Sequence, residues 1–431
     1  MKKGSGKSRV EKVKILIHYY YERVRRDAMN FLKWLALSVL TGLVVGGASG
    51  IFAGCIKYAA EYRNNHQWVF LLLPIVGLVI VFLYQKMGRK DGGTNQVLAA
   101  IRSKDDIPFR SAPLIFVATL LTHFAGGSAG REGASIQFGG SLGNLLGELV
   151  HLDEVDRHVM IMCGMSAAFA AVFGTPMAAA VFAMEVVSVG VMYYAALLPC
   201  VIASIIAAEF ATGMGILPET FPVERIPQLT LETAAKMGAI AVACGVISIL
   251  FCVLLKGTGK LYEKYLKNPY VRVFAAGCLI ILLTILLQTG DYMGAGSGLI
   301  EKAIAKGEAR PFDFFWKMIL TALTMRAGYR GGEIVPAFSI GATFGCVAGH
   351  LLGFSPEVAA AASMVALFCG VTNCPITAML ISFELFGFSG AAYYLIAISI
   401  SYAVSGYYSL YKDQTIVYSK YKARYINRRT R

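Results

Sequence analysis

The sequence predicts an all-α polytopic membrane protein built from two inverted-topology repeats of broken and re-entrant helices. Apolar residues make up 56% of its 431 residues and charged residues only 15%, against about 25% charged in ordinary soluble domains. A soluble protein this apolar would expose large sticky patches, whereas a bilayer accepts one helix for about every 20 apolar residues. Blocks of residues also recur in the two halves of the chain. This composition excludes a soluble enzyme, a disordered chain and a disulfide-bonded secreted domain.

The apolar residues form successive runs of helical length. In chain order the runs are 31–55, 67–86, 112–130, 158–190, 192–213, 234–256, 271–289, 314–325, 336–353, 357–385 and 390–410. Several runs contain Gly or Pro, and the chain has 45 glycines. Glycine permits close helix contact and interrupted helices in membranes. We therefore expect helices of unequal length, some of which end inside the bilayer.

The net charge of +14 comes largely from basic residues at the two ends. Residues 1–30 form a basic N-terminal segment, and residues 412–431 a C-terminal pore segment with a basic tail. The positive-inside rule places both termini in the cytoplasm, and the plasma membrane is the expected location. These ends are expected to contact anionic lipid headgroups rather than nucleic acid, since no aromatic platform accompanies them.

Three blocks of residues recur in the same order, 199 to 203 positions apart. They are 93–101 with 296–304, Gly139 and Gly143 with Gly341 and Gly345, and Pro176 and Glu185 with Pro375 and Glu384. The duplication predicts a first transmembrane repeat at 31–212 and a second at 233–411, joined by a proline-containing linker at 213–232. In such repeats, broken helices direct their N-termini at a shared site, where the partial positive charge and unpaired N–H groups suit an anion.

Residues 126–135 form the first block with ionisable residues inside an apolar region, since they place Arg131 and Glu132 between apolar stretches. An ionisable residue at membrane depth is costly and usually marks a transport pathway. The Glu132 carboxylate can occupy an anion site and leave it on protonation, which would make it both gate and proton carrier. The alternative is a loop ion pair outside the membrane.

The second block is residues 331–338, another transition from glycine to helix. Pro336 suits a first helical turn, and the backbone of Glu333, Ile334 and Val335 would offer N–H donors to an anion. Glu333 adds a possible second proton group. Alternatively, Glu333 only favours the positive end of its own helix.

The remaining polar residues point to no enzyme and no cofactor. The nine cysteines and six histidines are scattered, so neither a disulfide framework nor a metal site is expected. Residues 126–130 fit the G-x-S-x-G pattern, which makes an intramembrane serine hydrolase that uses Ser128, with His123 nearby, a remote alternative. That motif needs a strand-to-helix turn in an α/β sheet, which we do not expect here. A cation-coupled solute carrier is a further alternative.

The two blocks resemble the CLC family of chloride channels and proton-coupled anion exchangers. Residues 130–133 match its G-[KR]-E-G motif, 331–336 resemble its G-x-F-x-P region, Gly93 and Thr94 its G-S-G-x-P region, and 416–418 the segment with its central tyrosine. The resemblance covers essentially the whole chain. It implies two inverted halves, a homodimer with one pore in each subunit, and transport of halide anions and protons.

The resemblance also implies a role for each matching residue. Glu132 would be the external gating glutamate. The central halide site would be formed by the hydroxyls of Thr94 and Tyr418 and by the backbone of Glu333 and Ile334. The outer halide site would be formed by the backbone of Arg131 and Gly133. From the residues alone, Thr94 is equally a helix N-cap and Tyr418 an interfacial anchor.

Some positions depart from the common pattern. Family exchangers carry a second proton-handling glutamate at the position of Val186, whereas channels, like this chain, do not. The preceding Glu185 is expected to be structural, and Glu384 is its equivalent in the second half. The fluoride/proton exchanging branch also lacks the internal glutamate, although it usually has methionine at the place of Thr94. Chloride and fluoride both remain open. Proton-coupled antiport is the expected mechanism and a passive chloride channel the alternative, with no regulatory domain after Tyr418.

Overall fold

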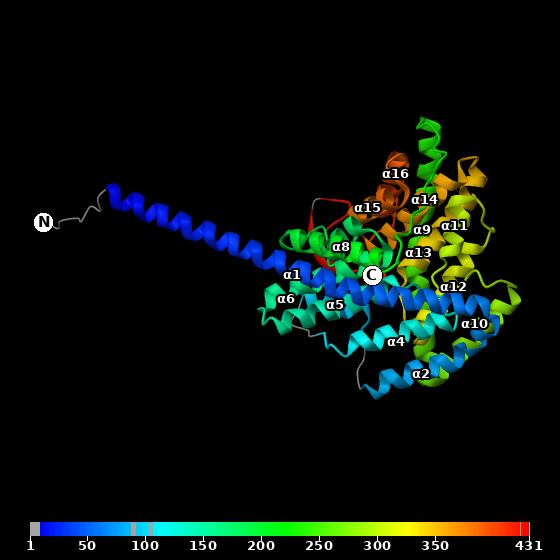
Figure 1. Cartoon of the computed structure of the whole chain (residues 1–431). Helices are drawn as coiled ribbons and strands as arrows, with labels where there is room; N and C mark the ends of the chain where they lie inside the picture. The colour runs from blue at the N-terminus through cyan, green and yellow to red at the C-terminus, as the bar shows by residue number, and fades with distance from the viewer. Residues whose placement is uncertain (1–8, 88–91, 103–106, 423, 431) are drawn as a thin grey trace.

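The computed structural model describes residues 9–87, 92–102, 107–422 and 424–430. Over these residues the chain forms sixteen α-helices and three short strands (Figure 1). The first eight helices are α1 (Arg9–Asn65), α2 (Leu73–Lys86), α3 (Thr94–Arg102), α4 (Ser111–Phe124), α5 (Glu132–Leu149), α6 (Glu154–Phe173), α7 (Pro176–Glu185) and α8 (Leu197–Gly213). The next eight are α9 (Leu231–Tyr265), α10 (Pro269–Leu286), α11 (Ser297–Ala305), α12 (Asp313–Ala327), α13 (Ile334–Leu352), α14 (Pro356–Thr372), α15 (Pro375–Phe386) and α16 (Ala391–Val404).

The two sets of eight helices correspond one to one in order. Helix α5 packs on α6 as α13 packs on α14, and α6 contacts α8 as α14 contacts α16. Helices α2 and α10, equivalent members of the two halves, pack on each other. The predicted all-α architecture with an internal repeat is therefore confirmed.

The helices differ in length in the way that the interrupted apolar runs predict. Within the residues that the structure describes, seven stretches, in α1, α2, α6, α8, α9, α10 and α13, are long and apolar enough to cross a membrane. Others are shorter: α7 has 10 residues and α15 has 12. At 1.5 Å per residue, 12 residues cover about 18 Å, less than the ~30 Å hydrocarbon core. Such helices end within a membrane, and the chain is a multi-pass membrane protein.

The recurring glycines explain how tightly α5 packs on α6 and α13 on α14. A Cβ atom on Gly139 or Gly143 would overlap the backbone carbonyls of α6, and one on Gly341 or Gly345 would overlap those of α14. Small residues allow membrane helices to approach this closely. The repeated glycine block therefore records the same helix contact in each half.

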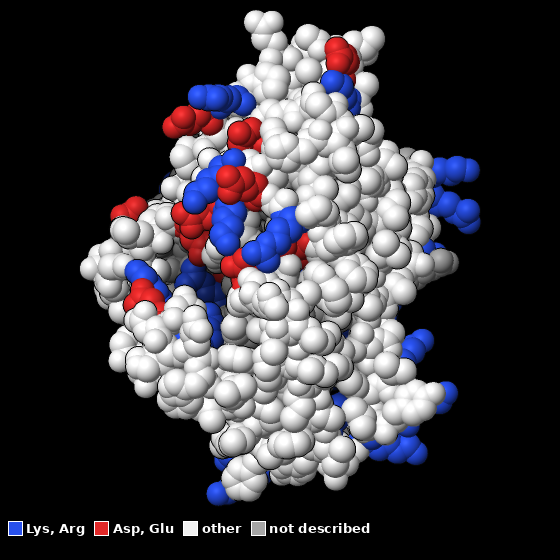
Figure 2. Space-filling model, turned by 90° about the vertical axis from the view of Figure 1, so that its right-hand side faces the viewer, with Lys and Arg blue, Asp and Glu red and all other residues white. Residues whose placement is uncertain are grey.

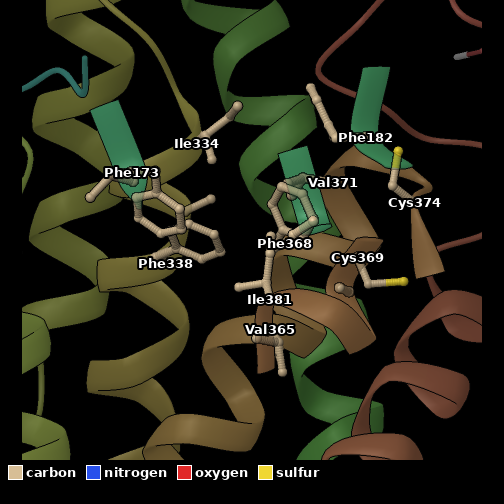
Figure 3. Packing of buried hydrophobic residues seen from close by; sticks show 14 of the residues in the cluster. Phe173, Phe182, Ile334, Phe338, Val365, Phe368, Cys369, Val371, Cys374 and Ile381 are labelled. Carbon is tan, nitrogen blue, oxygen red and sulfur yellow. The ribbon is translucent and has the colours of Figure 1, made fainter. Parts of the chain in front are cut away.

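Aromatic side chains from both halves meet in the buried core (Figure 3). The ring of Phe338 on α13 lies between Phe173 at the end of α6, at 5.5 Å, and Phe368 on α14, at 5.2 Å. Ile334, the first residue of α13, is buried in the same cluster. The core thus fixes the start of α13 against the first half.

Two segments lie outside this helical body. The first part of α1 projects from it (Figure 1) and has exposed side chains, among them Ile17, Tyr20 and Val24. Of the predicted basic N-terminal segment, residues 1–8 lie outside the described residues. Between α8 and α9, residues 214–230 form neither helix nor strand; the linker predicted at 213–232 includes this segment.

The sequence predicted no strands, but the structure contains a small three-stranded sheet. Strand β1 (Ser188–Val189) pairs in parallel with β2 (Thr415–Tyr418), which pairs antiparallel with β3 (Tyr425–Arg429). The β-branched and aromatic residues of β2 favour an extended strand. The C-terminal segment is therefore attached to the end of α7 by a β-ladder.

Candidate functional site

The two halves of the chain join at Gly130 and Gly332. The N–H of each glycine donates to the carbonyl oxygen of the other, both at 2.7 Å, in an isolated antiparallel bridge. The two residues are equivalent positions of the repeat. A side chain on Gly332 would clash with the backbone of Gly133, so this contact requires glycine.

A second reciprocal pair of hydrogen bonds flanks the bridge. The N–H of Ser128 donates to Thr324 Oγ1 at 3.2 Å, and the N–H of Arg330 donates to Thr122 Oγ1 at 3.1 Å. Each bond joins a loop of one half to a helix of the other. The local two-fold relation therefore extends beyond the glycines.

Helices α5 and α13 begin two residues after these glycines, so their N-termini meet where the halves join. The first turn of a helix has N–H groups without a partner inside the helix and carries partial positive charge. The N-cap residues, Arg131 and Glu333, make no capping bond with their side chains. Two helix N-termini at one place form an arrangement suited to a negative ion.

Glu132 lies at the first position of α5 and is 1% exposed. Its Oε2 accepts the backbone N–H of Arg131 at 3.0 Å, and its Oε1 lies 3.4 Å from Arg131 Nε. The ion pair that the sequence left open is present, but its carboxylate is buried at the helix N-terminus rather than in an exposed loop. Arg131 also donates from a terminal nitrogen to Glu219 Oε1 at 2.8 Å.

Thr94 and Gly133, expected at the central and the outer halide site, are in direct contact. Thr94 is the first residue of α3, and its hydroxyl donates to the carbonyl oxygen of Gly133 at 3.1 Å. This bond crosses to α5 and does not cap α3. A hydroxyl donor therefore lies within one residue of Glu132.

Glu333 and Ile334 lie at the start of α13. Glu333 is partly buried, and its Oε1 lies 3.7 Å from a guanidinium nitrogen of Arg326 on α12. Its side chain makes no capping hydrogen bond to its own helix, and its position at the N-terminus of α13 is one that the helix dipole favours for a carboxylate. Ile334 is buried, and its backbone begins the helix.

Tyr418 does not join the other candidate residues. It ends β2 with 47% of its surface exposed, and its ring packs edge-on against Tyr425 on β3 at 5.9 Å. The pairing of β2 with β3 holds it at this surface. Tyr411, just before that strand, is buried, with 3% of its surface exposed. Tyr411 is thus the buried tyrosine of the pair, and its place directly after the last apolar run was the available sequence signal.

A cavity of about 770 Å³ reaches the other side of Arg131. Its wall includes Lys57, Glu61, Arg63, Arg131, Glu219 and Asp291. Lys57 and Glu61 are exposed, so solvent enters the cavity. On the face drawn in Figure 2, acidic and basic side chains gather around a hollow, and most of the remaining surface is uncharged.

Ser128 is hydrogen-bonded to Thr321 and Lys317 and not to His123. Its hydroxyl accepts a hydrogen bond from Lys317 Nζ at 3.0 Å, and His123 instead bonds through Nδ1 to Thr119 O. The buried Lys317 ammonium also donates to the carbonyls of Tyr292 and Gly294. All three hydrogen-bond donors of this ammonium are therefore occupied. Lys317, a lone charge in the apolar run 314–325, was not among the residues predicted from the sequence.

Comparison with known proteins gives several matches over most of the chain. A family model described as voltage gated chloride channel matches residues 76–406. A chloride/fluoride channel protein of Pseudomonas syringae pv. tomato is 34% identical over 397 residues, which cover 90% of this chain and 88% of that protein. The H(+)/Cl(-) exchange transporter ClcA of Vibrio cholerae is 25% identical over 384 residues, 81% of each chain.

Two solved structures share the architecture. A CLC-type fluoride/proton antiporter has 32% sequence identity and a TM-score of 0.85, over 90% of this chain and 98% of that chain. A slow cyanobacterial Cl-/H+ antiporter has 20% identity and a TM-score of 0.72, over 86% of this chain and 94% of that chain. The second likeness is one of fold.

Proposed function

The chain belongs to the voltage-gated chloride channel family, and from this we propose that it exchanges small halide ions for protons across the membrane. Relatives named as chloride/fluoride channel, fluoride/proton antiporter and chloride/proton exchanger support this function. The chloride/fluoride channel protein and the CLC-type fluoride/proton antiporter, both more than 30% identical to this chain, carry fluoride in their names. We therefore place fluoride first and chloride second as the transported ion.

The main observation in support of this proposal is the buried position of Glu132. As a carboxylate it lies at the positive end of α5, bonded to the Arg131 backbone N–H, where a halide would also bind most favourably. Protonation removes its negative charge and with it the attraction to Arg131 and to the helix terminus. The neutral side chain then leaves, and a halide takes its place. One residue thereby couples proton uptake to anion entry.

The halide sites follow from the groups around the joined helix N-termini. The outer site uses backbone N–H groups of Arg131 and Gly133. The central site uses the backbone of Glu333 and Ile334 together with the hydroxyls of Thr94 and Tyr411. Tyr411 replaces Tyr418 in this assignment because its side chain is buried, whereas that of Tyr418 is half-exposed.

Glu333 is the second proton group of the proposal. Val186 is buried and apolar at the position of the internal proton glutamate of family exchangers, so protons need another carboxylate. Glu333 lies at the start of α13, paired with Arg326 at 3.7 Å. It would pass protons between the central site and the side of the membrane opposite the cavity.

Flux from liposomes tests the exchange mechanism. Purified protein is reconstituted with a fluoride or chloride gradient, and external halide and pH are recorded together. Exchange predicts that a halide gradient drives protons uphill. Fast halide movement without proton movement would instead favour the second candidate, a passive channel. Val186 supports that candidate because it replaces the internal glutamate of family exchangers.

We further infer the setting in which this transport occurs. The basic ends of the chain support a plasma-membrane protein with both termini in the cytoplasm. Each subunit holds both N-termini of its own site, so one pore per subunit follows. A homodimer of two such subunits is the assembly we propose.

A further inference from the structure

Glu219 lies in the segment between the two repeats and is held in place from both sides. Pro218 packs on Gly174, where a Cβ atom would come within 2.6 Å of its Cα. On the other side, the N–H of Phe221 donates to Leu385 O on α15 at 2.9 Å. These contacts fix the segment across the ends of α6 and α15. Glu219 therefore has a defined position, although its segment contains no helix or strand.

Glu219 is connected to Glu132 through one guanidinium group. Arg131 donates to Glu219 Oε1 at 2.8 Å from a terminal nitrogen, and its Nε lies 3.4 Å from Glu132 Oε1. Both carboxylates thus lie against the same side chain. Arg131 itself cannot give up a proton in a protein, so it positions the two acids without carrying protons between cavity and gate.

The cavity reaches Glu219 but not Glu132. Arg131 and Glu219 line its wall, and Glu219 has 22% of its side chain exposed against 1% for Glu132. Water in the cavity therefore meets Glu219 before it can reach the gate.

Other charged or titratable groups on the wall are differently engaged. They are Lys57, Glu61, Arg63, His123 and Asp291. Asp291 pairs with Lys302 at 3.1 Å, and the His123 ring bonds to the carbonyl of Thr119 while its own carbonyl accepts from Arg63. Glu61 makes no hydrogen bond or ion pair with Arg131 in the described part of the chain. Of the three acidic residues on the cavity wall, which are Glu61, Glu219 and Asp291, only Glu219 therefore shares a cation with Glu132.

We infer that Glu219 loads protons onto Glu132 and sets the pH at which the gate opens. A proton from cavity water binds the Glu219 carboxylate, forming an O–H bond. This neutral acid releases the Arg131 guanidinium, which moves out from between the two carboxyl groups. The proton then passes from Glu219 to the Glu132 carboxylate, which regenerates the Glu219 anion. The inference rests on the gating role proposed for Glu132 and adds a second residue to it.

Charge gives the direction of the effect. Two carboxylates that share one cation disfavour each other's ionised form, and a nearby cation favours it. Replacing Glu219 with a neutral residue leaves Arg131 to stabilise the Glu132 carboxylate alone. Protonation of the gate then requires more acidic solution.

The test compares Glu219→Gln with Glu61→Gln in liposomes, with halide and proton flux measured from pH 4.5 to 8. The Gln side chain still offers an oxygen to Arg131 but binds no proton. We expect the midpoint of the pH profile to move about one pH unit towards acid in Glu219→Gln and to stay in place in Glu61→Gln. A Glu219→Gln profile equal to that of the wild type overturns the inference, since a merely structural tether would leave it unmoved.

Two further variants keep the outcomes separate. If Glu219→Gln does not fold, Glu219→Asp carries the test: its shorter side chain withdraws the charge from Arg131, and an unshifted profile again overturns the inference. Glu132→Gln in the same assay tests the underlying proposal. Continued proton transport in Glu132→Gln defeats the proposed function itself, whereas its loss together with an unchanged Glu219→Gln profile defeats only the role of Glu219.

Discussion

Glu185 and Glu384 each bind the start of the helix to which the other belongs. The Glu185 carboxylate accepts the backbone N–H groups of Ile376 at 3.0 Å and Thr377 at 2.8 Å, at the start of α15. The Glu384 carboxylate accepts those of Met177 and Ala178 at the start of α7, both at 2.9 Å. A carboxylate at a helix N-terminus satisfies orphan donors and the helix dipole. These reciprocal hydrogen bonds hold the two halves of the chain together.

Replacing Glu185 with Ala is expected to lower stability strongly. The buried Glu185 also accepts the Thr377 hydroxyl at 2.6 Å, and each hydrogen bond to a charged group contributes about 1.5–3 kcal/mol. The thermal unfolding midpoint in detergent should fall by several degrees or more. Glu209→Gln, an exposed residue of α8, serves as control. An unchanged midpoint for Glu185→Ala would show that the reciprocal contact contributes little.

Replacing Glu132 with Gln should abolish proton transport while halide movement continues. The amide binds no proton and carries no charge that competes with a halide for the N-terminus of α5. Simultaneous recordings of pH and halide from liposomes measure both. Glu148→Gln, at the exposed end of the same helix, should keep full coupling. Proton transport at the wild-type ratio in Glu132→Gln would remove this residue from the mechanism.

The two tyrosines of the C-terminal segment give a paired comparison. Tyr411→Phe removes a buried hydroxyl from the proposed central site, whereas Tyr418→Phe changes a half-exposed ring on β2. A hydrogen bond to a charged partner contributes about 1.5–3 kcal/mol, so halide affinity should weaken at least about tenfold in Tyr411→Phe. Isothermal titration with fluoride and chloride measures it. Equal affinity in both variants would exclude Tyr411 from the site.

Glu333→Gln should slow proton transport and leave halide binding nearly intact. Its backbone N–H stays at the start of α13, so the central anion site persists, while the second proton group is lost. Arg326 still has an oxygen to bond. The measured quantity is the ratio of proton to halide flux. A ratio equal to that of the wild type would mean that protons cross by another route.

The starts of the two helices at the site could be predicted from the sequence because each has a local residue pattern. Glycines that allow close approach precede an ionisable residue and then an apolar run, at 130–133 and again at 331–336. These positions depend on neighbours in the chain and on the repeat. The meeting of Gly130 with Gly332 then follows from the duplication.

Residues brought to the site by distant packing could not be located in this way. Tyr418 matched a short motif, but strand pairing with β3 holds it at the surface, and the buried tyrosine is Tyr411. Glu219 belonged to a polar, proline-containing linker whose path across the ends of α6 and α15 is set by contacts far along the chain. No local pattern reports such contacts.

Gly332→Ala tests whether the junction of the halves determines the site. A methyl group at this position would overlap the backbone of Gly133, which belongs to α5 and cannot move aside as a flexible side chain would. The bridge to Gly130 must then open, and the N-termini of α5 and α13 separate. We expect both the thermal midpoint and the halide flux to fall. Gly298→Ala is the matched control, since its Cβ would meet nothing within 4 Å. If Gly332→Ala transported halide like Gly298→Ala, the site would not depend on close contact between the two helix starts.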